Sequence, residues 1–138
     1  MKNILEEIAA RTRERIAKEK SCISVSELEN RIQEVNKNAR QKITFLQALQ
    51  KDGMSYICEV KKASPSKGLI APDFPYLAIA KEYEQAGASA ISCLTEPFYF
   101  QGADQYLREI AATVQIPVLR KDFTVDEYMI LSLIHISE

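Results

Sequence analysis

The stretch that decides the fold is an apolar run leading into a polar loop, and it reads Tyr56-Ile57-Cys58-Glu59-Val60-Lys61-Lys62-Ala63-Ser64-Pro65-Ser66-Lys67-Gly68. Its first residues favour a β-strand, because the Asp52-Gly53 breaker stands before them and the Ser64-Pro65 turn signal follows them. The stretch therefore predicts a strand whose carboxyl end opens into a loop.

Opposite charges lie within this strand. Side chains of a strand alternate between its two faces, so Glu59 and Lys61 share one face and Cys58 and Val60 share the other. An acid and an ammonium at the end of a buried strand have two explanations. They form either a structural ion pair or a catalytic pair whose protonation is tuned by its surroundings.

Helices and strands alternate after this stretch. Asp73 is a candidate N-cap for a helix that ends near Gly87, a residue typical of a helix terminus. A short apolar strand without polar alternation is predicted at 90–94, a helix at about 103–113, and a further strand at 116–121. Asp122 or Thr124 is expected to cap a last helix that contains Tyr128 and Met129.

This alternation predicts βαβ units and an α/β fold with a parallel sheet, either open or closed into a barrel. In both architectures the chemistry lies beyond the carboxyl ends of the strands. Glu59, Lys61, Phe100 and Lys121 all fall at or just past such ends. The alternatives are that Lys121 is a solvated strand end and that residues 98–100 only pack the loop.

The first fifty residues predict a helical extension before the sheet. A helix is expected over residues 3–20, and a second follows Ser26-Glu27-Leu28-Glu29, which has the spacing of a capping box. A short third helix is expected at about 43–50. We therefore expect residues 1–50 to form a helical extension that covers part of the domain.

Composition excludes several classes of protein. The 138 residues are 46% hydrophobic and 27% charged, which is typical of a soluble globular domain. The formal net charge of −1 gives no basic field for a nucleic-acid partner. No apolar run approaches the ~20 residues of a membrane span, and the first residues lack a signal peptide's apolar core. The sequence thus predicts a cytoplasmic protein without a nucleic-acid or membrane partner.

Cysteine and histidine narrow the chemistry further. Cys22, Cys58 and Cys93 lie far apart and have no metal-ligand spacing, so we expect free thiols and no metal site. The only histidine is His135, which argues against a Ser/His or Cys/His mechanism. Acid–base chemistry would have to use carboxylates and lysines.

Four blocks of the sequence together resemble one enzyme family. They are residues 57–68, residues 86–96, Tyr99-Phe100-Gln101-Gly102, and residues 116–123 with the run Leu119-Arg120-Lys121-Asp122-Phe123. In this order, and with a helical extension before them, they are similar to the indole-3-glycerol-phosphate synthases of tryptophan biosynthesis. The resemblance covers about residues 1–130 and implies a (β/α)₈ TIM-barrel fold.

The resemblance also implies an activity. Members of the family are carbon–carbon lyases that convert 1-(2-carboxyphenylamino)-1-deoxyribulose 5-phosphate to indole-3-glycerol phosphate with loss of carbon dioxide and water. They use neither a metal nor an organic cofactor, and they are in some cases fused to or associated with other tryptophan-pathway enzymes. The small phosphorylated substrate is the partner implied for this chain.

Site roles follow from the same resemblance. Lys121 matches the general acid that acts on the substrate ketone, Lys61 matches the lysine that engages the substrate carboxylate, and Glu59 matches its base or electrostatic partner. Around the aromatic ring of the substrate, the resemblance places four further residues, Ser64, Pro65, Phe100 and Phe123.

The chain departs from the family in length. A (β/α)₈ barrel needs roughly 200 residues or more, whereas this sequence predicts a single partial domain. That domain comprises the helical extension (1–50), the first three βα units (51–130) and a tail without family resemblance (131–138). The expectation is therefore either the family's synthase activity or an inactive half-barrel that works only by associating with a complementary barrel portion.

Overall fold

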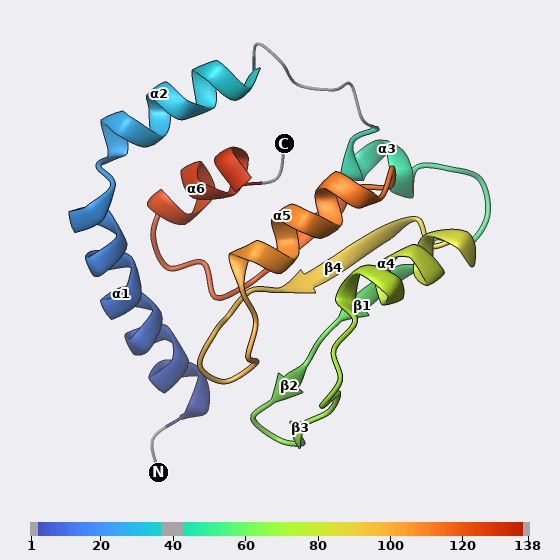
Figure 1. Ribbon diagram of the computed structural model, residues 1–138, viewed down its shortest axis with the longest axis horizontal. Helices are drawn as coiled ribbons and strands as arrows, with labels where there is room; N and C mark the ends of the chain where they lie inside the picture. Colours follow the sequence, from blue (N-terminus) through green and yellow to red (C-terminus); the bar gives the residue numbers. More distant parts are fainter. Residues whose placement is uncertain (1–2, 37–42, 137–138) are drawn as a thin grey trace. The chain divides into compact units, whose positions relative to one another are not determined.

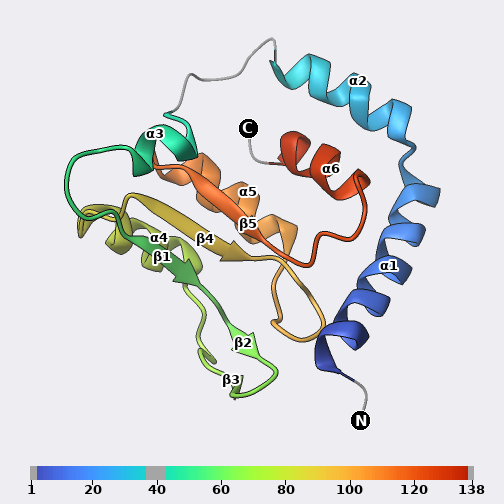
Figure 2. The same cartoon turned by 180° about the vertical axis from the view of Figure 1, so that it is seen from behind.

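The computed structural model describes residues 3–36 and 43–136, which form two compact units. Unit 1 contains the described residues 3–36 and 123–136, and unit 2 contains residues 43–122. Figures 1 and 2 show the elements of both units from opposite sides. These units differ from the predicted segments 1–50 and 51–130 at both boundaries.

Unit 2 is built on a parallel sheet. Its strands are β1 (Ile57–Val60), β4 (Ala90–Leu94) and β5 (Val118–Lys121), in the spatial order β1-β4-β5. Both neighbouring pairs are parallel, so the prediction of βαβ units is confirmed. The central strand β4 is buried along its whole length, as its mostly apolar sequence without polar alternation predicts.

Two helices cover one face of this sheet. They are α4 (Tyr76–Gln85) and α5 (Asp104–Thr113), which lie side by side against the strands (Figures 1 and 2). Their buried residues Ala80, Leu107 and Ile110 face inward. A short helix, α3 (Phe45–Leu49), contacts β4, and Thr44 and Gln47 form a reciprocal capping box at its start.

Gly87 ends α4 as its position in the sequence predicts. Its φ of 93° is left-handed, and its amide donates to the Glu84 carbonyl at 3.0 Å while the Ala88 amide donates to Tyr83 at 3.0 Å. This pair of bonds is the Schellman arrangement, which satisfies the last helical carbonyls. The turn then delivers the chain directly into β4.

The register of the sheet separates two sets of side chains. Paired residues of parallel strands share a face, and the face toward the helices includes Val60, Cys93 and Arg120, which occupy matching positions. We call the opposite face the site face. It carries the following residues: Ile57, Glu59, Ala90, Ser92, Leu94, Leu119 and Lys121.

Unit 1 consists of three helices, α1 (Ile4–Cys22), α2 (Val25–Asn36) and α6 (Tyr128–Ile136). Their common core is formed by Ile16, Leu28, Tyr128 and Met129. The Tyr128 hydroxyl donates to the Ile23 carbonyl at 2.9 Å, so its one polar atom is satisfied inside this core. The helix that follows β5 in sequence thus packs on the amino-terminal helices.

Three helices begin at residues other than those predicted. The helix α2 starts at Val25, and the hydroxyl of Ser24, rather than that of Ser26, accepts the Glu27 amide at 3.2 Å. Pro75, not Asp73, stands at the start of α4. Before α6, Asp126 accepts the Tyr128 amide at 2.9 Å, so neither Asp122 nor Thr124 fills that role.

Candidate active site

Glu59 and Lys61 form an ion pair at the carboxyl end of β1. The Lys61 Nζ lies 2.7 Å from the Glu59 Oε1, and each side chain keeps 34% of its surface exposed. A pair exposed to this degree contributes little to stability. It remains open to a ligand, which a buried structural pair would not be.

Lys121 lies on the same face at the end of β5. The register pairs it with Leu94 of the central strand, and its carbonyl accepts the Thr95 amide at 3.0 Å. Because β4 separates β1 from β5, the two strands that carry Glu59 and Lys121 are roughly 10 Å apart. Within the described part of the chain no ion pair joins Lys121 to Glu59, so the site face presents a charged pair and a separate exposed lysine.

The polar loop after β1 folds into a small hairpin. Its strands are β2 (Ala63–Ser64) and β3 (Gly68–Leu69), paired antiparallel. The Ser64 hydroxyl accepts the Lys67 amide at 3.2 Å across the turn that contains Pro65. That amide is therefore engaged within the hairpin.

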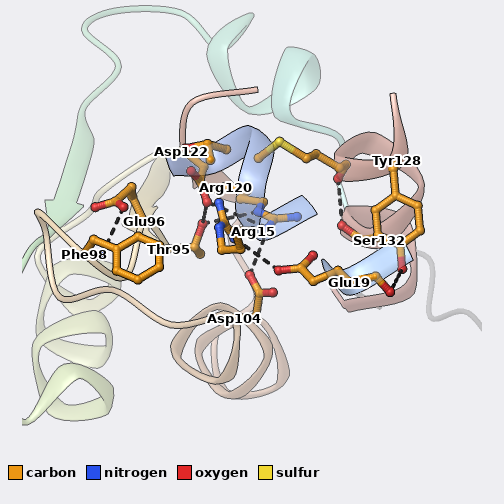
Figure 3. Close-up of polar contacts among 12 residues, drawn as sticks. Arg15, Glu19, Thr95, Glu96, Phe98, Asp104, Arg120, Asp122, Tyr128 and Ser132 are labelled. Carbon is orange, nitrogen blue, oxygen red and sulfur yellow. Dashed lines mark hydrogen bonds and ion pairs between the residues drawn. The ribbon is translucent and has the colours of Figure 1, made fainter. Parts of the chain in front are cut away.

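The aromatic turn, residues 97–102, follows β4 and is organised by Glu96. The Glu96 side chain is fully buried, and its carboxylate accepts the amides of Phe98, Tyr99 and Phe100 at 3.0, 2.7 and 3.1 Å. Figure 3 shows the carboxylate directed at the start of the turn. Phe98 is half exposed and Phe100 partly so, and both rings belong to the loop at the carboxyl end of the sheet.

A second polar cluster fixes the end of β5 on the helix side. Arg120, whose side chain is only 4% exposed, donates from Nε to the Thr95 hydroxyl at 3.2 Å, and its Nη2 lies 3.1 Å from Asp104 Oδ1. The Thr95 hydroxyl donates to Asp122 at 2.8 Å (Figure 3). The cluster ties β5 to the end of β4 and to the start of α5, and it thereby holds the backbone on which Lys121 stands.

Sequence reasoning missed Glu96, Thr95 and Arg120. One signal was present, because Thr95 and Glu96 are polar residues that follow directly on a buried, mostly apolar strand. Phe123, a predicted substrate contact, is the first residue of the second segment of unit 1 and is half-buried there. The structure therefore gathers Glu59, Lys61, Ser64, Pro65, Phe100 and Lys121 at the strand ends of unit 2, and Phe123 belongs to unit 1.

Neither Cys58 nor Cys93 lies on the site face, and Cys22 belongs to unit 1. Cys22 is exposed, Cys58 is half-buried, and Cys93 is buried on the helix face. Burial, with a smaller contribution from Asp104, raises the pKa of the Cys93 thiol to about 12, so it stays protonated as a small core residue. Within residues 3–36 and 43–136, no three metal-ligating side chains gather into a candidate site, and no helix there has the length and apolar character to cross a membrane.

Comparison with known proteins gives one consistent family. The profile of the family described as indole-3-glycerol phosphate synthase matches residues 5–136. The match extends past residue 130, where the sequence predicted that the resemblance stops, and it includes all of α6.

Individual relatives agree with the profile. Proteins named indole-3-glycerol phosphate synthase from Ruminiclostridium cellulolyticum and Lacticaseibacillus paracasei are each 52% identical over 128 and 127 residues. One from Aliarcobacter butzleri is 47% identical over 127 residues. Each alignment covers 92% of this chain and 48% of the relative. The chain spans about half the length of the curated relatives it matches.

Proposed function

This chain belongs to the indole-3-glycerol phosphate synthase family of (β/α)₈ barrels, and we propose that its site face is the first part of a site that closes the indole ring. The substrate would be 1-(2-carboxyphenylamino)-1-deoxyribulose 5-phosphate, and the products indole-3-glycerol phosphate, carbon dioxide and water. The observation that carries the proposal is the placement of Glu59, Lys61 and Lys121 on one face at the carboxyl ends of their strands.

The geometry suits the chemistry of ring closure. The aryl carbon that bears the carboxylate attacks the ketone carbon, and negative charge grows on the ketone oxygen. The exposed ammonium of Lys121 supplies a proton and a positive charge for that oxygen. Loss of carbon dioxide returns the electrons of its bond to the ring, and the new hydroxyl then leaves as water.

Lys61 and Glu59 have complementary tasks in this scheme. Lys61, whose backbone lies roughly 10 Å from that of Lys121, holds the substrate carboxylate on the aryl carbon that attacks the ketone. Glu59 sets the position of the Lys61 ammonium through their 2.7 Å contact and accepts a proton during dehydration. Phe100, Ser64, Pro65 and Phe123 are proposed contacts of the aromatic ring.

A second candidate function is a non-catalytic half-barrel that acts only with a complementary barrel portion. The observation that favours it is that the alignment with each of these relatives covers only 48% of the relative's length. In the described residues β1 and β5 are the outer strands of the sheet. On the site face, Ile57 is 48% exposed and Leu119 is 41% exposed, so an apolar surface stands open beside these edges.

One experiment separates the two functions. The purified chain is assayed alone and after mixing with a separately expressed carboxyl-terminal portion of a family member. We expect no turnover by the chain alone and recovered synthase activity in the mixture. Turnover by the monodisperse chain alone would contradict the half-barrel alternative, and an inactive but assembled mixture would contradict the synthase proposal.

Substitutions then test the site assignment in the active mixture. Lys121→Ala is expected to lower kcat by about 10²–10⁴-fold, the usual contribution of a positioned acid. Lys81→Ala is the matched control, because Lys81 is exposed on the outer helix α4. Equal activity of the two variants would remove Lys121 from the mechanism.

A further inference from the structure

Glu96 is a buried carboxylate to which the proposed chemistry assigns no role. Its side chain has no exposed surface, and among the described residues no lysine or arginine forms an ion pair with it. A buried charge without compensation is strongly unfavourable. Its compensation here comes from three successive backbone amides, those of Phe98, Tyr99 and Phe100.

Those amides converge on the carboxylate as they would on a bound anion. Successive N–H groups of a turn form an anion-binding nest, and hydrogen bonds to a charged acceptor are about twice as strong as neutral ones. The chain supplies its own anion for this nest. The contacts fix the backbone of three aromatic residues at once, and Phe100 is one of them.

The far end of the aromatic turn is held by the same residue. The Gly102 amide donates to the Glu96 carbonyl at 2.9 Å, and Gln101 adopts a left-handed φ of 51° to bring it there. A Cβ at Gly102 would lie 2.4 Å from the Leu94 carbonyl oxygen, so the turn is pressed against the end of β4. Glu96 therefore anchors the turn at both ends, by its side chain and by its main chain.

We propose that Glu96 is a positioning residue that sets the aromatic turn, and with it the Phe100 ring, at the mouth of the site face. What Phe100 contacts there rests on the proposed function, whereas the anchoring of the turn does not. A purely structural role for Glu96 would stabilise the domain without affecting how an aromatic substrate is held. The two roles differ in what a neutral glutamine at this position would change.

The first test needs no turnover. In the unsubstituted chain, the amide protons of Phe98, Tyr99 and Phe100 should exchange with solvent as slowly as those of β4, although they lie in a turn. In Glu96→Gln their exchange should accelerate by about tenfold or more while β4 and α5 keep their protection. With ring-labelled phenylalanine, only the signals of Phe98 and Phe100 should move.

Controls keep this test decisive. Glu82→Gln, an exposed carboxylate on α4, should change none of these signals. If Glu96→Gln fails to fold, Glu96→Asp replaces it, because it retains the charge on a shorter side chain. The amide exchange rates of the unsubstituted chain test the anchoring in either case. Loop-like fast exchange of the three amides would overturn the proposal.

The second test concerns the substrate and uses the active mixture of barrel portions. A lost aromatic wall weakens ground state and transition state alike, so Glu96→Gln should raise KM by about tenfold with kcat nearly unchanged. Combined with Phe100→Ala, the effects should be strongly non-additive, since Glu96 acts through Phe100. A lower kcat at constant KM, or additive effects, would contradict the positioning role. An inactive mixture would count against the proposed function and leave the exchange test to decide the anchoring.

Discussion

Gly102 has the least room for change of any glycine in the described chain. A methyl group there would meet the Leu94 carbonyl oxygen at 2.4 Å and two further backbone carbon atoms at 2.7 Å. Two of these atoms belong to Leu94, the last residue of the buried strand β4, and the third to Thr95, which follows it; this backbone cannot move without disturbing the pairing of β4 with β1 and β5. The glycine is therefore required by close approach of two backbones.

We expect Gly102→Ala to lower the free energy of unfolding by about 2–3 kcal/mol, as overpacking against a rigid neighbour does. Gly53→Ala is the control, because a Cβ there meets no atom within 4 Å and the cost comes only from its φ of 90°, about 1–2 kcal/mol. Urea unfolding of both variants measures the difference. An equal or smaller loss for Gly102→Ala would show that the turn can lift off the strand.

The charged residues of the site face could be predicted and their anchors could not. Alternation along a strand places Glu59 and Lys61 together, and the βαβ pattern places Lys121 at the same edge. Glu96 and Arg120 act through burial and through partners distant in sequence, such as Asp104. A one-dimensional pattern shows which side chains are polar, but it does not show which of them the fold encloses.

Asp126 links the start of α6 to α1. Its carboxylate accepts the Tyr128 amide and lies 2.7 Å from the Lys20 ammonium. Lys20 first, and the Tyr128 amide second, hold the pKa of Asp126 below its ordinary value. A depressed carboxyl pKa stabilises the fold above the ordinary value and loses that effect as the pH falls through the folded-state pKa.

The pH dependence of stability should reveal this contact. Asp126→Asn keeps a capping oxygen but removes the charge, so its Tm should lie below that of the unsubstituted chain at about pH 5 and converge with it near about pH 2. Thermal melts followed by circular dichroism measure both chains, with Asp73→Asn, an exposed carboxylate, as the control. A Tm difference that stays constant across this range would contradict the assignment.

Helices were predicted well and their first residues poorly, for a physical reason. The apolar pattern of residues 25–36 defines the body of α2, but Ser24 and Ser26 both have a hydroxyl suited to capping. Near α6, three candidate caps lie within five residues, and the packing of Tyr128 onto α1 selects Asp126. Local chemistry restricts the choice, and contacts distant in sequence make it.

The sheet as a whole leaves two outer strands in the described residues, and each carries an exposed apolar side chain on the site face. Ile57 and Leu119 are each exposed by more than two fifths on the site face. Parallel sheets are normally covered on both faces, so this surface favours association. The chain is expected to form oligomers at micromolar concentrations when no complementary barrel portion is present.

We expect Leu119→Lys to weaken this association by about tenfold, since a charge on an outer strand opposes further pairing and less apolar area is buried. Ile130→Lys is the matched control, because Ile130 is 54% exposed on α6 and lies outside the sheet. Light scattering coupled to size-exclusion chromatography measures the masses. A monomeric unsubstituted chain at these concentrations would contradict the expectation.

The nest around Glu96 has a consequence for how this loop can diversify. The carboxylate accepts hydrogen bonds from main-chain N–H groups, which every amino acid except proline possesses. The one proline of the turn, Pro97, precedes the three residues whose N–H groups are used. The side chains at 98–100 therefore take no part in the hydrogen bonds to Glu96 that fix their backbone. Ring size, polarity and charge at these positions can be exchanged without redesigning the loop, which makes the turn a natural place to retune substrate preference in the laboratory or through evolution.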